Sequence, residues 1–179
     1  MTAWRRLLHR WAGGRPTRVI EHDGRPLFER SVVWSGRVPL IGEIVVYLHH
    51  YLISDPNRGL HDHPWPWAVS LPLAGGYVEE RLRGIGRALI IGRLPRRPLR
   101  PYRLGGHDFH RVVLHGGVTS WSLFITGATV KEWGFLRDEA LPTDGFGVCT
   151  WMPQLAEQGS HTKWWLRAPR GRDLERAAP

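Results

Sequence analysis

Residues 61–76 read HDHPWPWAVSLPLAGG, and they contain two histidines, His61 and His63, one residue apart. Side chains at positions i and i+2 of an extended strand point to the same face. A third imidazole, from His110, could complete a metal site, and a chain whose only cysteine is Cys149 cannot build one from thiolates. The spacing alone also fits a purely structural pair of histidines. We predict a metal site made of His61, His63 and His110.

The sequence around this segment is typical of short strands separated by glycine turns. Gly75-Gly76 and Gly116-Gly117 are two such turns, and Asp23-Gly24 is a hairpin signal. Many short strands of this kind predict an all-β sandwich or barrel. The predicted strands cover residues 17–22, 27–34, 44–53, 61–73, 77–83, 88–94, 111–115, 120–126 and 129–135.

The two ends of the chain differ from this middle part. Residues 2–11 predict a short helix with an apolar stripe, and residues 152–158 are the other helical segment. The tail from Ala168 onward is basic and poor in apolar residues, so we expect it to be frayed. We therefore divide the chain into an N-terminal helix and linker at 1–16, a barrel at 17–138 and a C-terminal extension with a basic tail at 139–179.

The formal net charge of +9 comes from arginine, because Lys131 and Lys163 are the only lysines among the 179 residues. Such a charge can attract nucleic acid or an anionic substrate, or it can reflect an arginine-rich coding sequence. No helix-turn-helix, zinc-finger or aromatic RNA-binding pattern is present, so we do not expect a nucleic-acid partner. Residues 1–14 lack the features of a signal peptide, and no apolar run could span a bilayer. We expect a soluble, cytoplasmic protein that does not bind membranes.

The spacing of His61, His63 and Gly75 resembles the first motif of the cupin superfamily. That motif has two histidines one residue apart, then a glutamate, then a glycine. The second cupin motif ends on a histidine preceded by a proline and glycine, and the stretch from Pro101 to His110 is similar to it. The resemblance covers residues 40–135 and extends to small bacterial and phage-type cupins. It implies a jelly-roll β-barrel with the metal site inside.

The sequence departs from the cupin pattern at two positions. The slot of the metal-binding glutamate holds Ala68, and Leu114 replaces the asparagine expected after the second motif. Losing the carboxylate leaves three neutral ligands. Three histidines on iron(II) resemble the cupin thiol dioxygenases and diketone-cleaving dioxygenases. The same set also suits zinc, nickel or manganese, and imidazole spacing does not choose among them.

Several residues near the histidines are candidates for other roles. We expect Asp62 either to form a hydrogen bond to an imidazole on the side away from the metal or to hold a turn. Glu79 could replace the missing carboxylate, or it could be a solvated strand residue. An inward Arg81 would need an anionic partner, such as a substrate carboxylate, and Tyr77 could help it orient the substrate. His107 would face away from the site on a regular strand, but a turn at Gly105-Gly106 could bring it in. We expect His49, His50 and His115 to be neighbours of the site or plain surface and core histidines. The large inward side chains could line a cavity or simply pack in the core. The candidates are Tyr47, Tyr51, Trp65, Trp67, Tyr77, Arg81, Trp121 and Phe124.

The leading functional hypothesis is an iron(II)-dependent dioxygenase that acts on a small organic substrate, with Arg81 and Tyr77 as catalytic residues. A non-enzymatic cupin that binds or senses a small molecule or metal is the second hypothesis. The third is a zinc- or nickel-supported isomerase or hydrolase. The tryptophan-rich N-terminal helix also suggests a homodimer.

Overall fold

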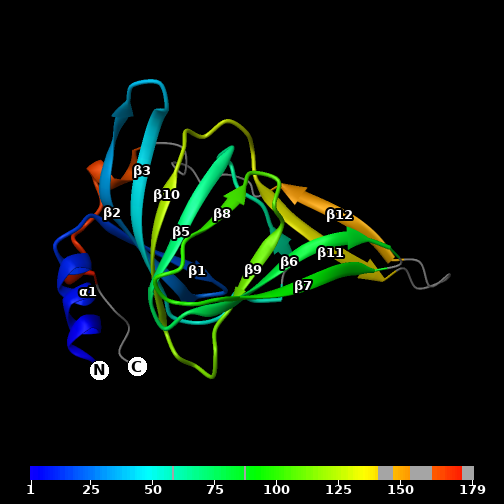
Figure 1. Ribbon diagram of the computed structural model, residues 1–179, viewed down its shortest axis with the longest axis horizontal. Coiled ribbons are helices and arrows are strands. Elements are labelled where there is room, and N and C mark those ends of the chain that lie inside the picture. The colour runs from blue at the N-terminus through cyan, green and yellow to red at the C-terminus, as the bar shows by residue number, and fades with distance from the viewer. Residues whose placement is uncertain (58, 87, 141–146, 154–162, 175–179) are drawn as a thin grey trace.

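The computed structural model describes residues 1–57, 59–86, 88–140, 147–153 and 163–174. Strands make up most of it, with one α-helix at the N-terminus and two short 3-10 helices near the C-terminus (Figure 1). The elements are α1 (Ala3–Gly13), β1 (Thr17–His22), β2 (Arg25–Val38), β3 (Gly42–Tyr51), β4 (Leu60–His61), β5 (Trp67–Ala74), β6 (Tyr77–Ile85), β7 (Leu89–Arg96), β8 (Tyr102–Gly105), β9 (His110–Val113), β10 (Ser120–Thr126), β11 (Gly134–Ala140), β12 (Gly147–Pro153), η1 (Trp164–Leu166) and η2 (Gly171–Asp173).

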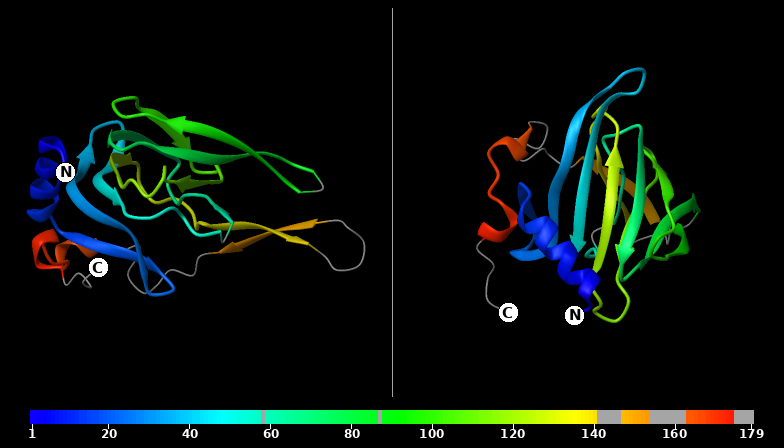
Figure 2. Two further views of the ribbon diagram at one scale, coloured as in Figure 1. Left: turned by 90° about the horizontal axis from the view of Figure 1, so that it is seen from below. Right: turned by 60° about the vertical axis from the view of Figure 1, so that its left-hand side comes forward.

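The strands form two six-stranded antiparallel sheets that face each other as a sandwich (Figures 1 and 2). The first sheet has the order β1-β2-β3-β10-β5-β8, and the second has the order β12-β11-β4-β9-β6-β7. The chain thus crosses repeatedly between the sheets, as in a jelly roll. This arrangement confirms the predicted all-β jelly-roll fold. It also brings β4 beside β9, so residues almost fifty positions apart become neighbours.

Gly75 and Gly76 make the crossing from β5 in the first sheet to β6 in the second. Both have positive φ angles, +86° and +71°, which glycine adopts without steric cost. A Cβ at Gly75 would also lie 2.3 Å from the carbonyl oxygen of Thr119. The glycine in the motif therefore permits a close approach between two backbone segments.

Side chains are buried in two layers, one between the sheets and one beneath the helix. α1 covers the outer face of the first sheet, as the right-hand view of Figure 2 shows, and Leu8, Ala12 and Trp121 pack together there. The helix is amphipathic, so Leu8 is 1% exposed while the neighbouring Leu7 is 52% exposed. Between the sheets, the core consists of Val32, Tyr47, Trp65, Ala68, Leu104 and Phe124.

Three sequence predictions about the elements are wrong. Residues 61–73 do not form one strand, because the chain leaves the second sheet after His61 and enters the first sheet only at Trp67. Pro64 and Pro66, in between, lack the N–H that a ladder needs. Residues 129–133 form no strand. They lie in a loop, where the N–H of Val130 donates to the carbonyl oxygen of Pro64.

The predicted helix at 152–158 is also wrong at its start, because Met152 pairs with Phe135 in the β11–β12 hairpin. The pairing with β11 overrides the local helical preference of this segment. Residues 154–158 lie outside the described residues.

The tail from Ala168 is not frayed up to Leu174. Arg170 forms a bridge with Pro16, and Gly171 is buried against α1. No helix in the described part of the chain has the length and apolar character to cross a membrane.

Candidate metal centre

His61, His63 and His110 come together on the inner face of the second sheet. His61 on β4 and His110 on β9 are directly opposite each other in the antiparallel ladder, so their side chains share one face. His63 follows in the loop after β4, and its Nε2 lies 2.8 Å from Nε2 of His110. One ring nitrogen from each histidine lies within 4.8 Å of the others. The structure thus assembles the three predicted ligands at one point.

The donor set fits a divalent transition metal. Two ligands at right angles on an ion with bonds of about 2.1 Å are roughly 3 Å apart, close to the separation of His63 and His110. A metal also requires neutral imidazole. Removal from water lowers the pKa of His63 well below its usual range, and the neighbouring His110 and His61 lower it further. His63 therefore carries a free lone pair at neutral pH.

Glu79 stands behind His110. It is fully buried, and its Oε1 lies 3.4 Å from Nδ1 of His110, within ion-pair range but without hydrogen-bond geometry. Arg81 donates to Oε1 at 2.7 Å and Arg96 to Oε2 at 2.5 Å. Burial would raise the pKa of Glu79, but His110, Arg81 and Arg96 together lower it to about 2. An ionised carboxylate on this side favours the Nδ1–H tautomer, which leaves Nε2 of His110 free for a metal.

Asp55 occupies the equivalent place behind His61. Its Oδ2 lies 3.9 Å from Nδ1 of His61 and accepts a hydrogen bond of 2.8 Å from the backbone N–H of Val112. Two of the three histidines therefore have a carboxylate on the Nδ1 side, and both carboxylates have further partners. This arrangement orients the imidazoles before a metal binds.

Asp62 points away from the histidine cluster and holds a turn, which is one of the two roles expected for it. It is buried, and its Oδ1 accepts a hydrogen bond of 2.7 Å from the N–H of Gly134. Its Oδ2 pairs with the ammonium group of Lys131. Asp62 thereby ties the segment that carries both His61 and His63 to the loop before β11.

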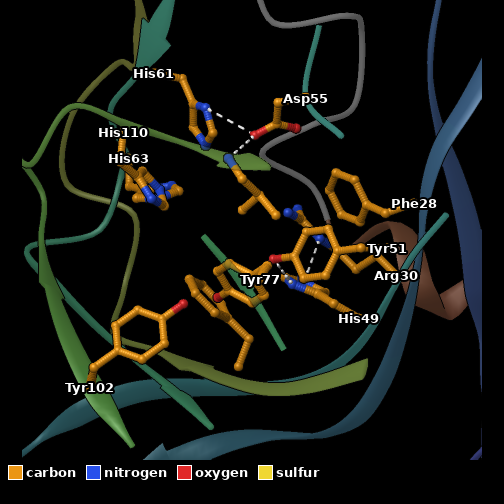
Figure 3. Close-up of a pocket in the computed structure, with 12 residues that line it drawn as sticks. Phe28, Arg30, His49, Tyr51, Asp55, His61, His63, Tyr77, Tyr102 and His110 are labelled. Atoms are coloured by element: carbon orange, nitrogen blue, oxygen red, sulfur yellow. Dashed lines mark hydrogen bonds and ion pairs between the residues drawn. The ribbon is translucent and has the colours of Figure 1, made fainter. Parts of the chain in front are cut away.

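The three histidines border a cavity of about 40 Å³ between the sheets (Figure 3). Figure 3 shows the histidines toward one side of this cavity, with Arg30, His49 and Tyr51 toward the other. The lining residues are Phe28, Arg30, His49, Tyr51, Asp55, His61, His63, Tyr77, Tyr102, His110, Val112 and Phe124.

Arg30, His49 and Tyr51 form a hydrogen-bonded chain along the cavity. Arg30 on β2 is directly opposite His49 on β3, and its Nε donates to Nε2 of His49 at 3.1 Å. Nδ1 of His49 lies 3.2 Å from the hydroxyl of Tyr51. Burial lowers the pKa of His49 well below its usual range, and the charge of Arg30 adds to this effect. Burial likewise raises the pKa of Tyr51 well above its usual value. The histidine is thus neutral and the phenol is protonated.

The other predicted site residues lie around this cavity in different ways. Tyr77 is 1% exposed and lines the cavity. Arg81 points inward beside His110, but its guanidinium already contacts the carboxylates of Glu79 and Asp108, at 2.7 and 3.3 Å. His107 is exposed and does not join the cluster.

The predicted wall of aromatic side chains is correct only in part. Tyr51, Tyr77 and Phe124 line the cavity, and Tyr47 and Trp65 pack beside it in the core. Trp121 lies instead beneath α1 on the outer face of the sheet, where its ring stacks on His50 at 4.0 Å. Trp67 and Arg81 are not among the lining residues.

Sequence reasoning missed Arg30 and Asp55 as parts of the site and misjudged Glu79 as a solvated residue or a ligand. His49, which the sequence allows either as a neighbour of the site or as a plain surface or core histidine, lines the cavity. The period-two pattern held a signal for Arg30, since Phe28 and Val32 flank it on the same strand face. Glu79 lies two residues before Arg81, so an inward Arg81 already implied an inward Glu79.

Comparisons with known proteins support the fold. No protein-family model matches the chain, and no curated protein matches it. Among solved structures, iron(II) HppE in complex with substrate shares 13% identity and a TM-score of 0.50 over 64% of this chain and 57% of that one. This chain therefore spans a little over half of the HppE chain.

Two further structures are also similar. Oxalate oxidase in complex with the substrate analogue glycolate shares 9% identity, with a TM-score of 0.49 over 70% of this chain and 63% of that one. An uncharacterised protein with a double-stranded β-helix domain from Klebsiella pneumoniae shares 16% identity, with a TM-score of 0.44 over 65% of this chain and 89% of that one. At these identities the likeness concerns the fold alone, which is the cupin-type double-stranded β-helix.

Proposed function

We propose that this cupin-type barrel binds a divalent metal through His61, His63 and His110 and acts as an iron(II)-dependent dioxygenase on a small organic substrate. The observation that carries this proposal is the convergence of three imidazole nitrogens within 4.8 Å at the wall of an interior cavity. Three protein ligands with further coordination positions open are typical of catalytic rather than structural metal sites.

When bound, iron(II) supplies the redox chemistry that reactions with dioxygen require. The residues of the chain orient the metal-binding imidazoles and shield the cavity. The carboxylates of Glu79 and Asp55 hold the imidazoles of His110 and His61 in the ligating orientation. The two sheets surround the cavity and limit the access of water to it.

Tyr77 and Arg81 have different parts in this proposal. The buried Tyr77 faces the cavity, where its hydroxyl can orient a substrate. Arg81 bonds to Glu79, which in turn contacts His110, so we assign Arg81 as a positioning residue for the metal ligand. Both roles depend on a bound metal.

A zinc- or nickel-supported hydrolase or isomerase is the second candidate. The observation that favours it is the same set of three imidazoles without a carboxylate, which also occurs in zinc enzymes that activate water. The two candidates differ in their need for oxygen.

Elemental analysis of protein purified without a histidine tag tests the metal site first. We expect about one metal ion per chain, lost in His61→Ala and retained in His107→Ala, which replaces an exposed histidine outside the cluster. Anaerobic loading with iron(II), followed by oxygen uptake with thiols, diketones and small acids, tests the activity. Wild-type protein that binds no iron would overturn the proposal. Turnover by the zinc form without oxygen would replace it with the second candidate.

A further inference from the structure

We infer that the cavity recognises an anionic group of its substrate, a small carboxylate, through the guanidinium of Arg30 and the hydroxyl of Tyr51. This inference rests on the proposed function, because it names the substrate class of the same site.

Arg30 differs from the other inward arginines in its partners. Arg81 and Arg96 both bond to the carboxylate of Glu79. Arg30 is partly buried, and within the described residues no carboxylate forms an ion pair with it. Its guanidinium instead lies 5.2 Å from the ring centre of Phe28 and 5.1 Å from that of Tyr47. A guanidinium held among aromatic rings favours an anionic partner, and the cavity beside it gives a ligand access.

The hydrogen bonds of Arg30 run in one direction. Arginine can only donate, so Nε2 of His49 accepts its hydrogen bond and Nδ1 of the neutral ring carries the proton. That Nδ1–H donates to the hydroxyl oxygen of Tyr51. The hydroxyl proton of Tyr51 is therefore free to donate to a third group. Tyr51 lines the cavity, so a ligand there can accept this proton.

Apart from the three histidines that would hold a metal, the rest of the cavity wall offers mainly hydroxyl donors. The hydroxyl groups of Tyr77 and Tyr102 also line it. Asp55 supplies the only carboxylate among the described lining residues, and that carboxylate contacts the N–H of Val112 and the ring of His61. A wall rich in donors and a free guanidinium fork match a carboxylate, which accepts two parallel hydrogen bonds from arginine.

The size of the cavity limits the ligand. A volume of about 40 Å³, where one water molecule needs about 10–15 Å³, admits only a small ligand. This space suits a carboxylate with a short carbon chain better than a sugar, nucleotide or peptide. The remaining end of such a molecule would reach the side of the cavity where the histidines lie (Figure 3).

Propionate and propionamide provide a matched test, because the two molecules have nearly the same shape and differ in charge. Each is titrated calorimetrically into the full chain, once metal-free and once loaded with zinc. We expect propionate to bind wild-type protein at least about tenfold more tightly than propionamide does, and we expect Arg30→Gln to abolish this preference. Arg97→Gln, which removes one exposed arginine, should keep the wild-type preference.

Two further variants separate recognition from folding. Tyr51→Phe keeps the ring and should weaken propionate binding several-fold, and more than it weakens propionamide binding, because a hydroxyl bonds more strongly to a carboxylate than to an amide oxygen. Arg30→Lys keeps the charge but loses the fork, and it should give an intermediate preference. Equal binding of the two ligands to wild-type protein, or no binding of propionate, would overturn the inference. A chain that binds zinc but shows no preference would leave the proposed metal site standing, whereas a chain that prefers propionate but binds no metal would overturn the metal site alone.

Discussion

Glu79 and the imidazole of His63 lie on opposite sides of His110. Glu79 Oε1 lies 3.4 Å from Nδ1 of His110, and Nε2 of His63 lies 2.8 Å from its Nε2. The ring of His110 therefore lies between an ionised carboxylate and the imidazole of His63. Glu79 thus places a carboxylate on β6, two residues before Arg81, which is opposite His110 in the ladder. The position where the cupin motif has its metal-binding glutamate holds Ala68 instead.

Glu79→Gln should weaken metal binding about 10- to 100-fold, because it removes the charge that fixes the tautomer of His110 while keeping the shape of the side chain. Competition with a chromophoric chelator measures the affinity. Glu80→Gln is the matched control: Glu80 pairs with Arg111 and Arg93 and contacts none of the three histidines in the described chain. Equal affinities for the two variants would contradict an orienting role for Glu79.

The same residue predicts a pH dependence of stability. The pKa of Glu79 falls from 4.5 to about 2 on folding, so its ionisation stabilises the folded state above about pH 4.5, and this contribution is lost as the pH falls toward 2. A shift of this size corresponds to about 3 kcal/mol. In urea unfolding of metal-free protein at pH 7, the free energy of unfolding of the wild type should exceed that of Glu79→Gln by an amount of this order. The difference should shrink steadily below pH 4.5. A difference that stays constant down to pH 2.5 would contradict the assignment.

The N-terminal helix should contribute to stability and not to metal binding. Leu8→Ala removes a side chain that is 1% exposed and should cost about 2–5 kcal/mol of unfolding free energy. Leu7→Ala changes its half-exposed neighbour and should cost less than about 0.5 kcal/mol. Chemical denaturation with parallel metal titration checks both. A large metal-binding defect in folded Leu8→Ala protein would show that the helix acts on the site.

Gly75→Ala should destabilise the barrel far more than Gly117→Ala. Both glycines have positive φ angles, which cost about 1–2 kcal/mol for alanine. At Gly117 the added Cβ would meet open space, whereas at Gly75 it would lie 2.3 Å from the backbone oxygen of Thr119. Thermal unfolding of the two variants isolates the effect of the close approach, and equal losses would mean that the backbone angle alone matters.

The sequence was a good guide to strands and a weaker guide to their interruptions. Period-two patterns predicted most strands of both sheets within a few residues. The failures at 61–73 and 129–135 share one cause, because the two segments leave their sheets to bond with each other, as the N–H of Val130 does with Pro64. The contact itself depends on tertiary structure, and its local sign lies in the first segment alone, where Pro64 and Pro66 disfavour a continuous strand.

The residues of the candidate site were likewise predicted from the sequence only in part. The motif spacing identified the three histidines that the fold brings together, since i, i+2 spacing survives even where the strand stops after His61. The period-two pattern places Arg30 on the same strand face as Phe28 and Val32, but its part in the site depends on its cross-strand neighbour, His49, which the sequence does not reveal. Glu79 needed the register of β6 against β9, which places it opposite Val112.

The turn held by Asp62 bears on any attempt to transplant this centre. The strand ends at His61, and His63 lies in the loop that follows. The position of His63 depends on the carboxylate of Asp62, which pairs with Lys131 and accepts a hydrogen bond from the N–H of Gly134, some seventy residues later. A designed barrel given only the short histidine motif would lack this tether. The minimal portable unit is the segment from His61 to His63, the loop that carries Lys131, and the strand that carries His110.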